Sequence, residues 1–365
     1  MTVLETIMIS SFYLFIALMI SIQAHIGLRT LLFGITLPAE ALQDTDVRGI
    51  RRNYVLLTGG FAIVIGAVCF LMTRSQTTSR SIPHWAAAIF LLIVVSVFAI
   101  RISRMSAQRL KAARGWQVAV ETKRAASLAA GRTHSPVLGS WWYAAHITVM
   151  ALCIFFAVTG WNAIPQQIAV HMGPDGFPDH YIYKSVRTVF MMNIVQALMI
   201  PLFAGYNLMI SRARTSLDPQ DREGSLRKQL KLKKIHSITA WGISLLGIAN
   251  LGLLQAVILY GWKLNLLIRY NISFMSVFFL TLIGLLLYLR FRGLDQQRDI
   301  PSQEERHWKW LGSIYANPED PALFVPDRYG FLWTINMANP LGKIIAAATI
   351  AVPVIAILVV IFNFR

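Results

Sequence analysis

The chain has 365 residues, of which 56% are hydrophobic and only 14% are charged. Its mean hydropathy of +0.55 argues against a soluble globular domain and favours an integral membrane protein. A net charge of +17 would also suit a nucleic-acid-binding protein. The basic residues lie beside apolar runs, however, where attraction to anionic lipid accounts for them. We therefore expect membrane lipids, and no nucleic acid, as partners.

Apolar runs long enough to cross the hydrocarbon core of a bilayer recur along the chain. They predict an all-α fold, a polytopic transmembrane helix bundle with about eight spans. The spans are expected at roughly 5–28, 54–73, 85–103, 141–163, 186–210, 237–262, 271–290 and 342–363.

This pattern divides the chain into four regions. Residues 1–140 form N-terminal hairpins with basic inward loops, and residues 141–210 form the spans around a polar outward loop. Residues 211–290 are the central spans. Residues 291–365 hold an aromatic, proline-rich inward element and the last span.

The lysines and arginines predict the orientation. Four alternate loops, at 29–53, 101–140, 211–236 and 290–343, hold 27 of the 34 basic residues. Cytoplasmic loops carry such an excess. These loops are therefore expected in the cytoplasm, which puts both termini and the loop at 164–184 outside.

Two connectors carry helical patterns of their own. Residues 39–54 can form an amphipathic helix on the inner surface, or a solvated connector with the usual arginines. Residues 101–140 are expected as a helical extension lying on the inner face, ended by Gly131 and Pro136.

The fifth span contains a cluster of amides, Asn193, Gln196 and Asn207, near Pro201. Amides inside a membrane usually pair across helices. We expect these side chains to serve helix packing and not ligand binding.

The loop at 164–184 has three prolines, two glycines, two aspartates, two histidines and two tyrosines between apolar runs. This composition predicts a shaped loop and not a helix. We take it as the recognition site for something outside the cell. The candidate ligand-binding residues are His171, Asp175, Asp179, His180, Tyr181, Tyr183 and Lys184.

Three hypotheses fit this loop. His171, Asp175, Asp179 and His180 can converge on zinc, although their spacing matches no standard zinc pattern. The loop can instead be a rigid lid, with aspartates in Asx-turns and tyrosines at the headgroup level. Its acids and tyrosines can also receive a cationic, amphipathic peptide. We expect no cofactor, and zinc is the alternative.

The last inward loop, 290–343, has seven basic and seven acidic residues, so it is neutral where the other inward loops are positive. From His307 it is dense in Trp, Tyr, Pro and Asn, which predicts a small ordered element under the bundle. Such an element can offer a surface to a cytoplasmic partner. The candidate partner-binding residues are Trp308, Trp310, Tyr315, Asn317, Asp320, Arg328 and Asn336.

Common catalytic signatures do not occur. The chain has no GxxxxGK[ST], HExxH or GxSxG motif, and Glu5 is the one acid inside an expected span. Proton- or sodium-coupled transporters usually need intramembrane acids. We interpret the protein as non-catalytic. A metal-dependent membrane enzyme, or a lipid or peptide transporter, is the alternative.

Two segments resemble known bacterial membrane proteins. The first is Ile164–Pro165, His171, the turn at 174–176, Pro178–Asp179 and Lys184–Ser185. It resembles the loop of a domain of unknown function that forms the N-terminal half of SdpI-type immunity proteins. Gly173 stands where that family usually has Asn, and Met172 where it often has an aromatic residue.

The second segment carries Trp310-Leu311-Gly312, Ile314 to Pro318, Asp320-Pro321, Phe324 to Pro326, Arg328 and Thr334 to Asn336. It is similar to an uncharacterised C-terminal domain often joined to the first. The resemblance implies a protein of the bacterial cytoplasmic membrane that senses, or gives immunity to, a secreted peptide or envelope ligand. It also implies that the protein can signal to a cytoplasmic regulator.

Overall fold

The structure is a computed structural model that describes residues 3–25, 31–76, 78–116, 125–126, 137–172, 178–217, 221–261, 264–294, 306–327 and 333–363. Its long helices each overlap one of the eight expected spans, and several extend well beyond it. They are α1 (Val3–Ile22), α2 (Thr45–Thr73), α3 (Thr78–Ala113), α4 (Ala144–Thr159), α6 (Met191–Arg212), α7 (Arg222–Tyr260), α8 (Leu264–Phe291) and α10 (Pro340–Asn363).

The prediction of an all-α membrane bundle is confirmed. Helices α2, α3, α6 and α7 are long and apolar enough to cross a membrane, and so is α4 together with the 3-10 turn Ser140–Tyr143 that precedes it. The segments Ile9–His25, Ser273–Leu289 and Pro340–Ile355 are shorter apolar helices within the described parts of the chain.

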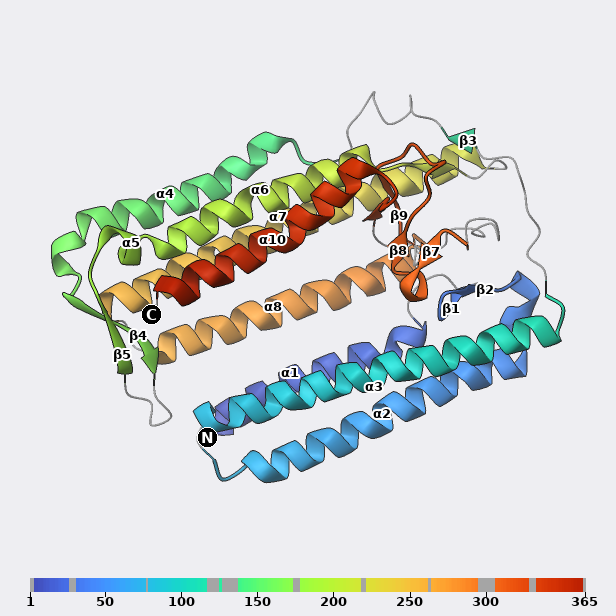
Figure 1. Ribbon diagram of the computed structural model, residues 1–365, viewed down its shortest axis with the longest axis horizontal. Helices are drawn as coiled ribbons and strands as arrows, with labels where there is room; N and C mark the ends of the chain where they lie inside the picture. Colours follow the sequence, from blue (N-terminus) through green and yellow to red (C-terminus); the bar gives the residue numbers. More distant parts are fainter. Residues whose placement is uncertain are drawn as a thin grey trace.

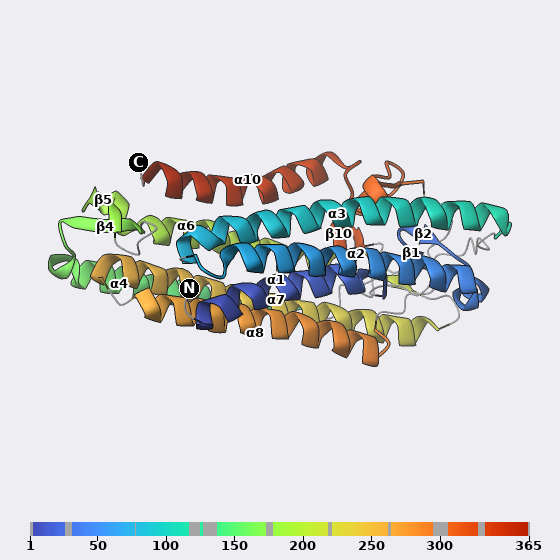
Figure 2. The same ribbon diagram turned by 90° about the horizontal axis from the view of Figure 1, so that it is seen from below.

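The long helices run up and down along one axis, so the molecule has two distinct ends (Figures 1 and 2). At one, the hairpin end, lie the hairpin of β4 (Gln167–Met172) and β5 (Pro178–Tyr183), the start of α1 and the end of α10. At the other, the basic end, lie short antiparallel strand pairs. They are β1 (Leu31–Leu32) with β2 (Ile35–Thr36), β3 (Ala125–Ala126) with β6 (Ser216–Leu217), β7 (Trp308–Lys309) with β8 (Ile314–Tyr315), and β9 (Phe324–Pro326) with β10 (Trp333–Ile335).

Helices α1, α2 and α3 pack together around Tyr13, which is buried between them. The Tyr13 hydroxyl donates a hydrogen bond of 2.7 Å to the Ala62 carbonyl, and its ring meets Trp85 edge to face. A polar hydroxyl inside this apolar cluster is thus satisfied by the neighbouring helix.

The remaining helices form a second group. Helix α7 contacts α4, α6 and α8, and α10 lies along α6. Phe279 of α8 packs against Phe12 and Phe15 of α1 and so joins the two groups.

The two connectors differ from expectation. A 3-10 turn, Ala39–Gln43, precedes α2, which begins at Thr45 and continues straight into the second span. Helix α3 likewise keeps its direction as far as Ala113 and does not lie along the inner face (Figure 1). The reason is that no glycine or proline occurs between Pro83 and Gly115, which has a φ of 63°. Gly131 and Pro136 lie outside the described residues.

Candidate functional site

The loop at 164–184 is a β-hairpin. Gln167 lies opposite Tyr183 and Ala169 opposite Tyr181, and the register shifts between Ala169 and His171. The expectation of a non-helical, shaped segment is confirmed, while its two strands were not predicted. The hairpin stands at the end of the bundle (Figure 1), where β4 contacts α7.

One face of the hairpin packs on the bundle. Ile168 lies opposite Ile182, and both belong to an apolar cluster with Val189 and Leu259 from the neighbouring helices. Successive residues of a strand point to opposite faces. The other face therefore carries Tyr181 and Tyr183, whose exposed fractions are 49% and 76%.

Lys184 clamps the base of the hairpin. Its Nζ donates hydrogen bonds to the carbonyls of Trp161 (2.6 Å) and Ile164 (3.1 Å) and lies 4.9 Å from the centre of the Trp161 ring. Ser185 then begins the four-residue helix α5 (Val186–Val189) with a capping box closed by Thr188. The amine of Lys184 is thus used to hold the hairpin.

The other predicted hairpin residues are only partly described. The backbones of His171 and His180 are paired, and the His180 side chain is exposed. Asp175, and the side chains of His171 and Asp179, lie outside the described residues. No group of three metal-ligating side chains occurs in the part of the chain that was described. Zinc binding stays a prediction.

A row of polar side chains runs through α4, α6 and α7 beneath the hairpin. We call this row the polar seam; its members are Gln255, Asn193, Gln196, Ser244, His146, Ser237 and Asn207. All seven are buried inside an apolar bundle, so each needs a partner within the protein.

The seam begins directly under the hairpin. Gln255 Nε2 donates to the carbonyl of Val189 (3.0 Å), in α5, and to Asn193 Oδ1 (2.7 Å). Asn193 Nδ2 donates to Gln196 Oε1 (2.9 Å), and Gln196 Nε2 reaches the Ile248 carbonyl (2.9 Å). The expected pairing of these amides across helices is confirmed.

The seam continues towards the basic end. His146 Nε2 and Ser244 Oγ are 2.8 Å apart, and Ser237 Oγ donates to Asn207 Oδ1 (2.6 Å). Asn207 Nδ2 donates to the carbonyl of Leu138, in the segment that leads into α4. Three separate groups of polar contacts therefore lie along the bundle, from beneath the hairpin to the basic end.

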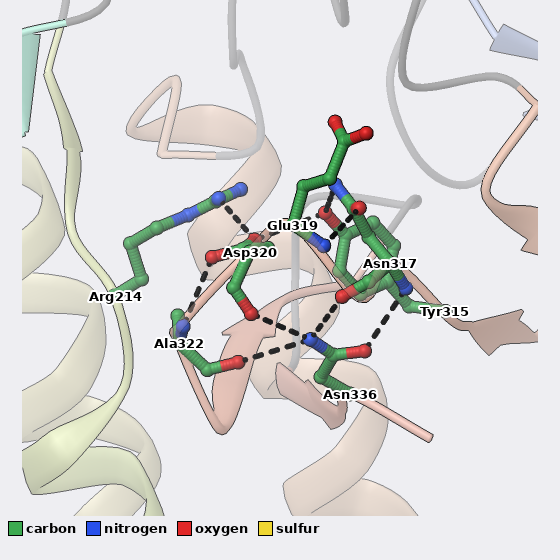
Figure 3. Close-up of polar contacts among 7 residues, drawn as sticks. All are labelled: Arg214, Tyr315, Asn317, Glu319, Asp320, Ala322 and Asn336. Atoms are coloured by element: carbon green, nitrogen blue, oxygen red, sulfur yellow. Dashed lines mark hydrogen bonds and ion pairs between the residues drawn. The ribbon is translucent and has the colours of Figure 1, made fainter. Parts of the chain in front are cut away.

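At the basic end, β7 to β10 and their turns form a small element organised around Asn336. Its side chain is fully buried, and Nδ2 donates to the carbonyls of Asn317 (2.9 Å) and Asp320 (3.0 Å). Its Oδ1 accepts from the backbone N–H of Asn317 (3.0 Å) and Ala338 (3.1 Å). One amide thus holds two turns that are distant in sequence (Figure 3).

Asp320 ties this element to the bundle. One carboxylate oxygen accepts from the Tyr315 hydroxyl (2.9 Å) and from Arg214, which follows α6. The other oxygen accepts from the Ala322 N–H (3.0 Å). The backbone N–H of Arg214 also donates to the Phe324 carbonyl of β9 (2.8 Å). We call this assembly of Arg214, Tyr315, Asn317, Asp320 and Asn336 the inner latch (Figure 3).

Apolar and cationic contacts support the latch. Phe324 and Trp333 pack against Ile210 and Leu232 of α6 and α7. Lys233 lies in the charged first part of α7, ahead of the apolar span that begins near Ser237. Its Nζ donates to the Ala213 carbonyl (2.6 Å), and burial lowers the pKa of this amine to about 8.

The predicted partner-binding residues divide into two sets. Tyr315, Asn317, Asp320 and Asn336 use polar groups within the latch, and the Trp308 ring packs at a tilt against that of Tyr315. Trp310 instead is 81% exposed. Arg328 lies outside the described residues. Arg214, which the sequence did not indicate, completes the site.

Two segments of the chain match protein-family models, one at the hairpin and one at the inner latch. Residues 148–197 match a domain of unknown function, DUF1648, and residues 318–343 match a family of unknown function, DUF5808. The first match covers the hairpin, Lys184, and Asn193 and Gln196 of the polar seam; the second covers Asp320 and Asn336. No curated protein and no solved structure matches the chain.

Proposed function

We propose that this is a non-catalytic, SdpI-like protein of the bacterial cytoplasmic membrane that senses, or gives immunity to, an extracellular peptide or envelope ligand. In this proposal the hairpin end faces outside, with both termini, and the basic end faces the cytoplasm. The excess of lysine and arginine in the four loops of the basic end supports this orientation.

The proposal rests mainly on one observation: the hairpin is held firmly at its base and exposes two tyrosines on its outer face. Tyr181 and Tyr183 lie side by side on the face away from the bundle, while Lys184 and Ile168 hold the opposite side. Tyrosine gives a large contact area at low conformational cost and is enriched where proteins bind peptides. We infer that this face contacts the ligand.

The polar seam and the inner latch supply a route to a cytoplasmic regulator. Gln255 contacts the backbone just after the hairpin, and Asn207 lies seven residues before Arg214 of the latch. A ligand that shifts the hairpin base changes the contacts at the top of the seam. We propose that Trp310, exposed beside the latch, contacts the regulator.

A challenge assay tests the proposal. Susceptible bacteria that express the protein are exposed to secreted, cationic killing peptides, and survival is compared with cells carrying an empty vector. We expect the protein to raise survival and Tyr181→Ala with Tyr183→Ala to abolish the gain. The control is Phe291→Ala, which removes an exposed aromatic side chain at the basic end. Equal survival with the double variant and the unaltered protein would contradict the proposal.

Metal analysis separates this proposal from the enzyme alternative. Purified protein is analysed for zinc before and after His171→Ala. Stoichiometric zinc that disappears in the variant would replace sensing by a metal-dependent activity. We expect both samples to lack stoichiometric zinc.

A further inference from the structure

An open hollow lies at the basic end, along the last three turns of α3. It has a volume of about 460 Å³ and is lined by Ile35 together with Arg104, Gln108, Lys111 and Trp116. Residues 104, 108 and 111 are spaced four and three apart, so they share one face of the helix. The hollow therefore places two cations and an amide along one wall, with an indole at its end.

The hollow lies just beyond the membrane span. The apolar part of α3 ends before Arg104, and tryptophan is enriched at the level of lipid headgroups. Helical side chains lean towards the N-terminus, which for α3 is the direction of the membrane. The side chains of α3 that line the hollow therefore lean towards the headgroup level.

The electrostatics favour an anion. Among the described residues that line the hollow, none is acidic. Asp44 and Asp46, at the neighbouring start of α2, bind Arg114 instead (3.4 and 2.9 Å). Carbonyl groups at the end of a helix would repel an anion. In the last turn of α3, two of them already accept hydrogen bonds: the Lys111 carbonyl from the Trp116 N–H, and the Ala112 carbonyl from the Gly115 N–H.

Arg104 is held in place before any ligand arrives. Its Nη1 donates to the carbonyls of Phe33 (3.1 Å) and Gly34 (2.9 Å) in the β1–β2 turn. In the described parts of the chain no acceptor meets its Nη2 or Nε. A fixed guanidinium with remaining donors is suited to bind phosphate oxygens.

We propose that this hollow binds the phosphate of an anionic phospholipid headgroup. Arg104 and Lys111 provide charge, Gln108 a neutral donor, and Trp116 an interfacial contact. A soluble phosphate offers the same group without acyl chains, so the two sources can be separated by experiment. The inference is independent of the sensing proposal.

Native mass spectrometry of the purified full chain tests the site. Detergent-solubilised protein is titrated with phosphatidylglycerol and, separately, with phosphatidylcholine. We expect selective retention of phosphatidylglycerol. Lys111→Gln should weaken that retention about fivefold. Gln108→Glu, which puts a negative charge into the hollow at an exposed position, should weaken it at least as much.

The matched control is Arg109→Gln, which removes an exposed cation of the same helix that does not line the hollow. It should leave retention unchanged. Equal losses in all three variants would show a general charge effect and overturn the site. Displacement of the lipid by millimolar inorganic phosphate as effectively as by fresh phosphatidylglycerol would overturn the lipid as the source.

Discussion

Asp320 accepts a hydrogen bond from Arg214, a residue 106 positions earlier in the chain. The contact joins the last loop of the basic end to the end of α6, which at its other end begins beside the hairpin. Because only 8% of the Asp320 side chain is exposed, its carboxylate has to find hydrogen-bond partners within the protein, and Arg214 is one of them. The latch is therefore a fixed part of the bundle.

Removal of Arg214 should weaken the latch. Arg214→Ala leaves the buried carboxylate with Tyr315 and the Ala322 N–H, and should lower the free energy of unfolding by about 2 kcal/mol or more. Chemical unfolding in detergent measures this loss. Arg212→Ala, an exposed arginine two residues earlier, should change stability by less than about 0.5 kcal/mol. Equal effects would show that the contact contributes nothing specific.

Asn336 and Asn339 offer a matched pair of amides. The Asn336 side-chain NH2 group donates to the carbonyls of Asn317 and Asp320, and Asn336→Asp replaces it with a carboxylate oxygen, which can only accept. This substitution should lower the free energy of unfolding by at least about 2 kcal/mol. Asn339 caps α10 by accepting from the Leu341 N–H, a role that aspartate fills as well. Asn339→Asp should therefore be neutral in the same unfolding experiment. A tolerated Asn336→Asp would refute the role of this amide.

Close packing of α4 and α7 at the seam depends on Gly252. A Cβ at this position would lie 2.4 Å from Cys153 Sγ, whereas a Cβ at Gly247 of the same helix meets nothing within 4 Å. Gly252→Ala should cost about 1–3 kcal/mol. Gly247→Ala should be neutral or stabilise by up to about 1 kcal/mol. Adding Cys153→Ala should restore much of the loss at Gly252; additive losses would argue against this contact.

Lys233 should give the latch a pH dependence. Below about pH 8 the amine is protonated in both states, so the folded protein bears the full cost of burying a charge. Between about 8 and the usual lysine pKa of about 10.5, the unfolded chain binds more protons, so stability rises with pH. The melting temperature of the unaltered protein should therefore rise from pH 7 to 9 relative to that of Lys233→Met. A constant difference would contradict this.

The helices could be predicted from the sequence, since each span is an apolar run of about the bilayer thickness. The hairpin strands could not, because each has only six residues and Pro178 interrupts the local pattern. The alternation of Ile168 and Val170, and of Tyr181 and Tyr183, was the available signal.

Only part of the inner latch could be predicted from the sequence. Its aromatic and Asn-Pro composition predicted an ordered element, but composition does not distinguish a side chain that binds its own chain from one that binds a partner. The role of Arg214 could not be inferred from the sequence, because its partner Asp320 lies 106 residues away. Lys184 looked like a ligand residue for the same reason: its two carbonyl acceptors become neighbours only after the hairpin folds.

The orientation of the two ends is the central claim, and cysteine labelling tests it most directly. In protein carrying Cys69→Ala and Cys153→Ala, single cysteines are placed at the exposed positions Tyr183 and Trp310 and treated with a membrane-impermeant maleimide. We predict that Tyr183→Cys is labelled in intact cells and Trp310→Cys only after permeabilisation. Labelling of Trp310→Cys in intact cells, with Tyr183→Cys protected, would contradict the account.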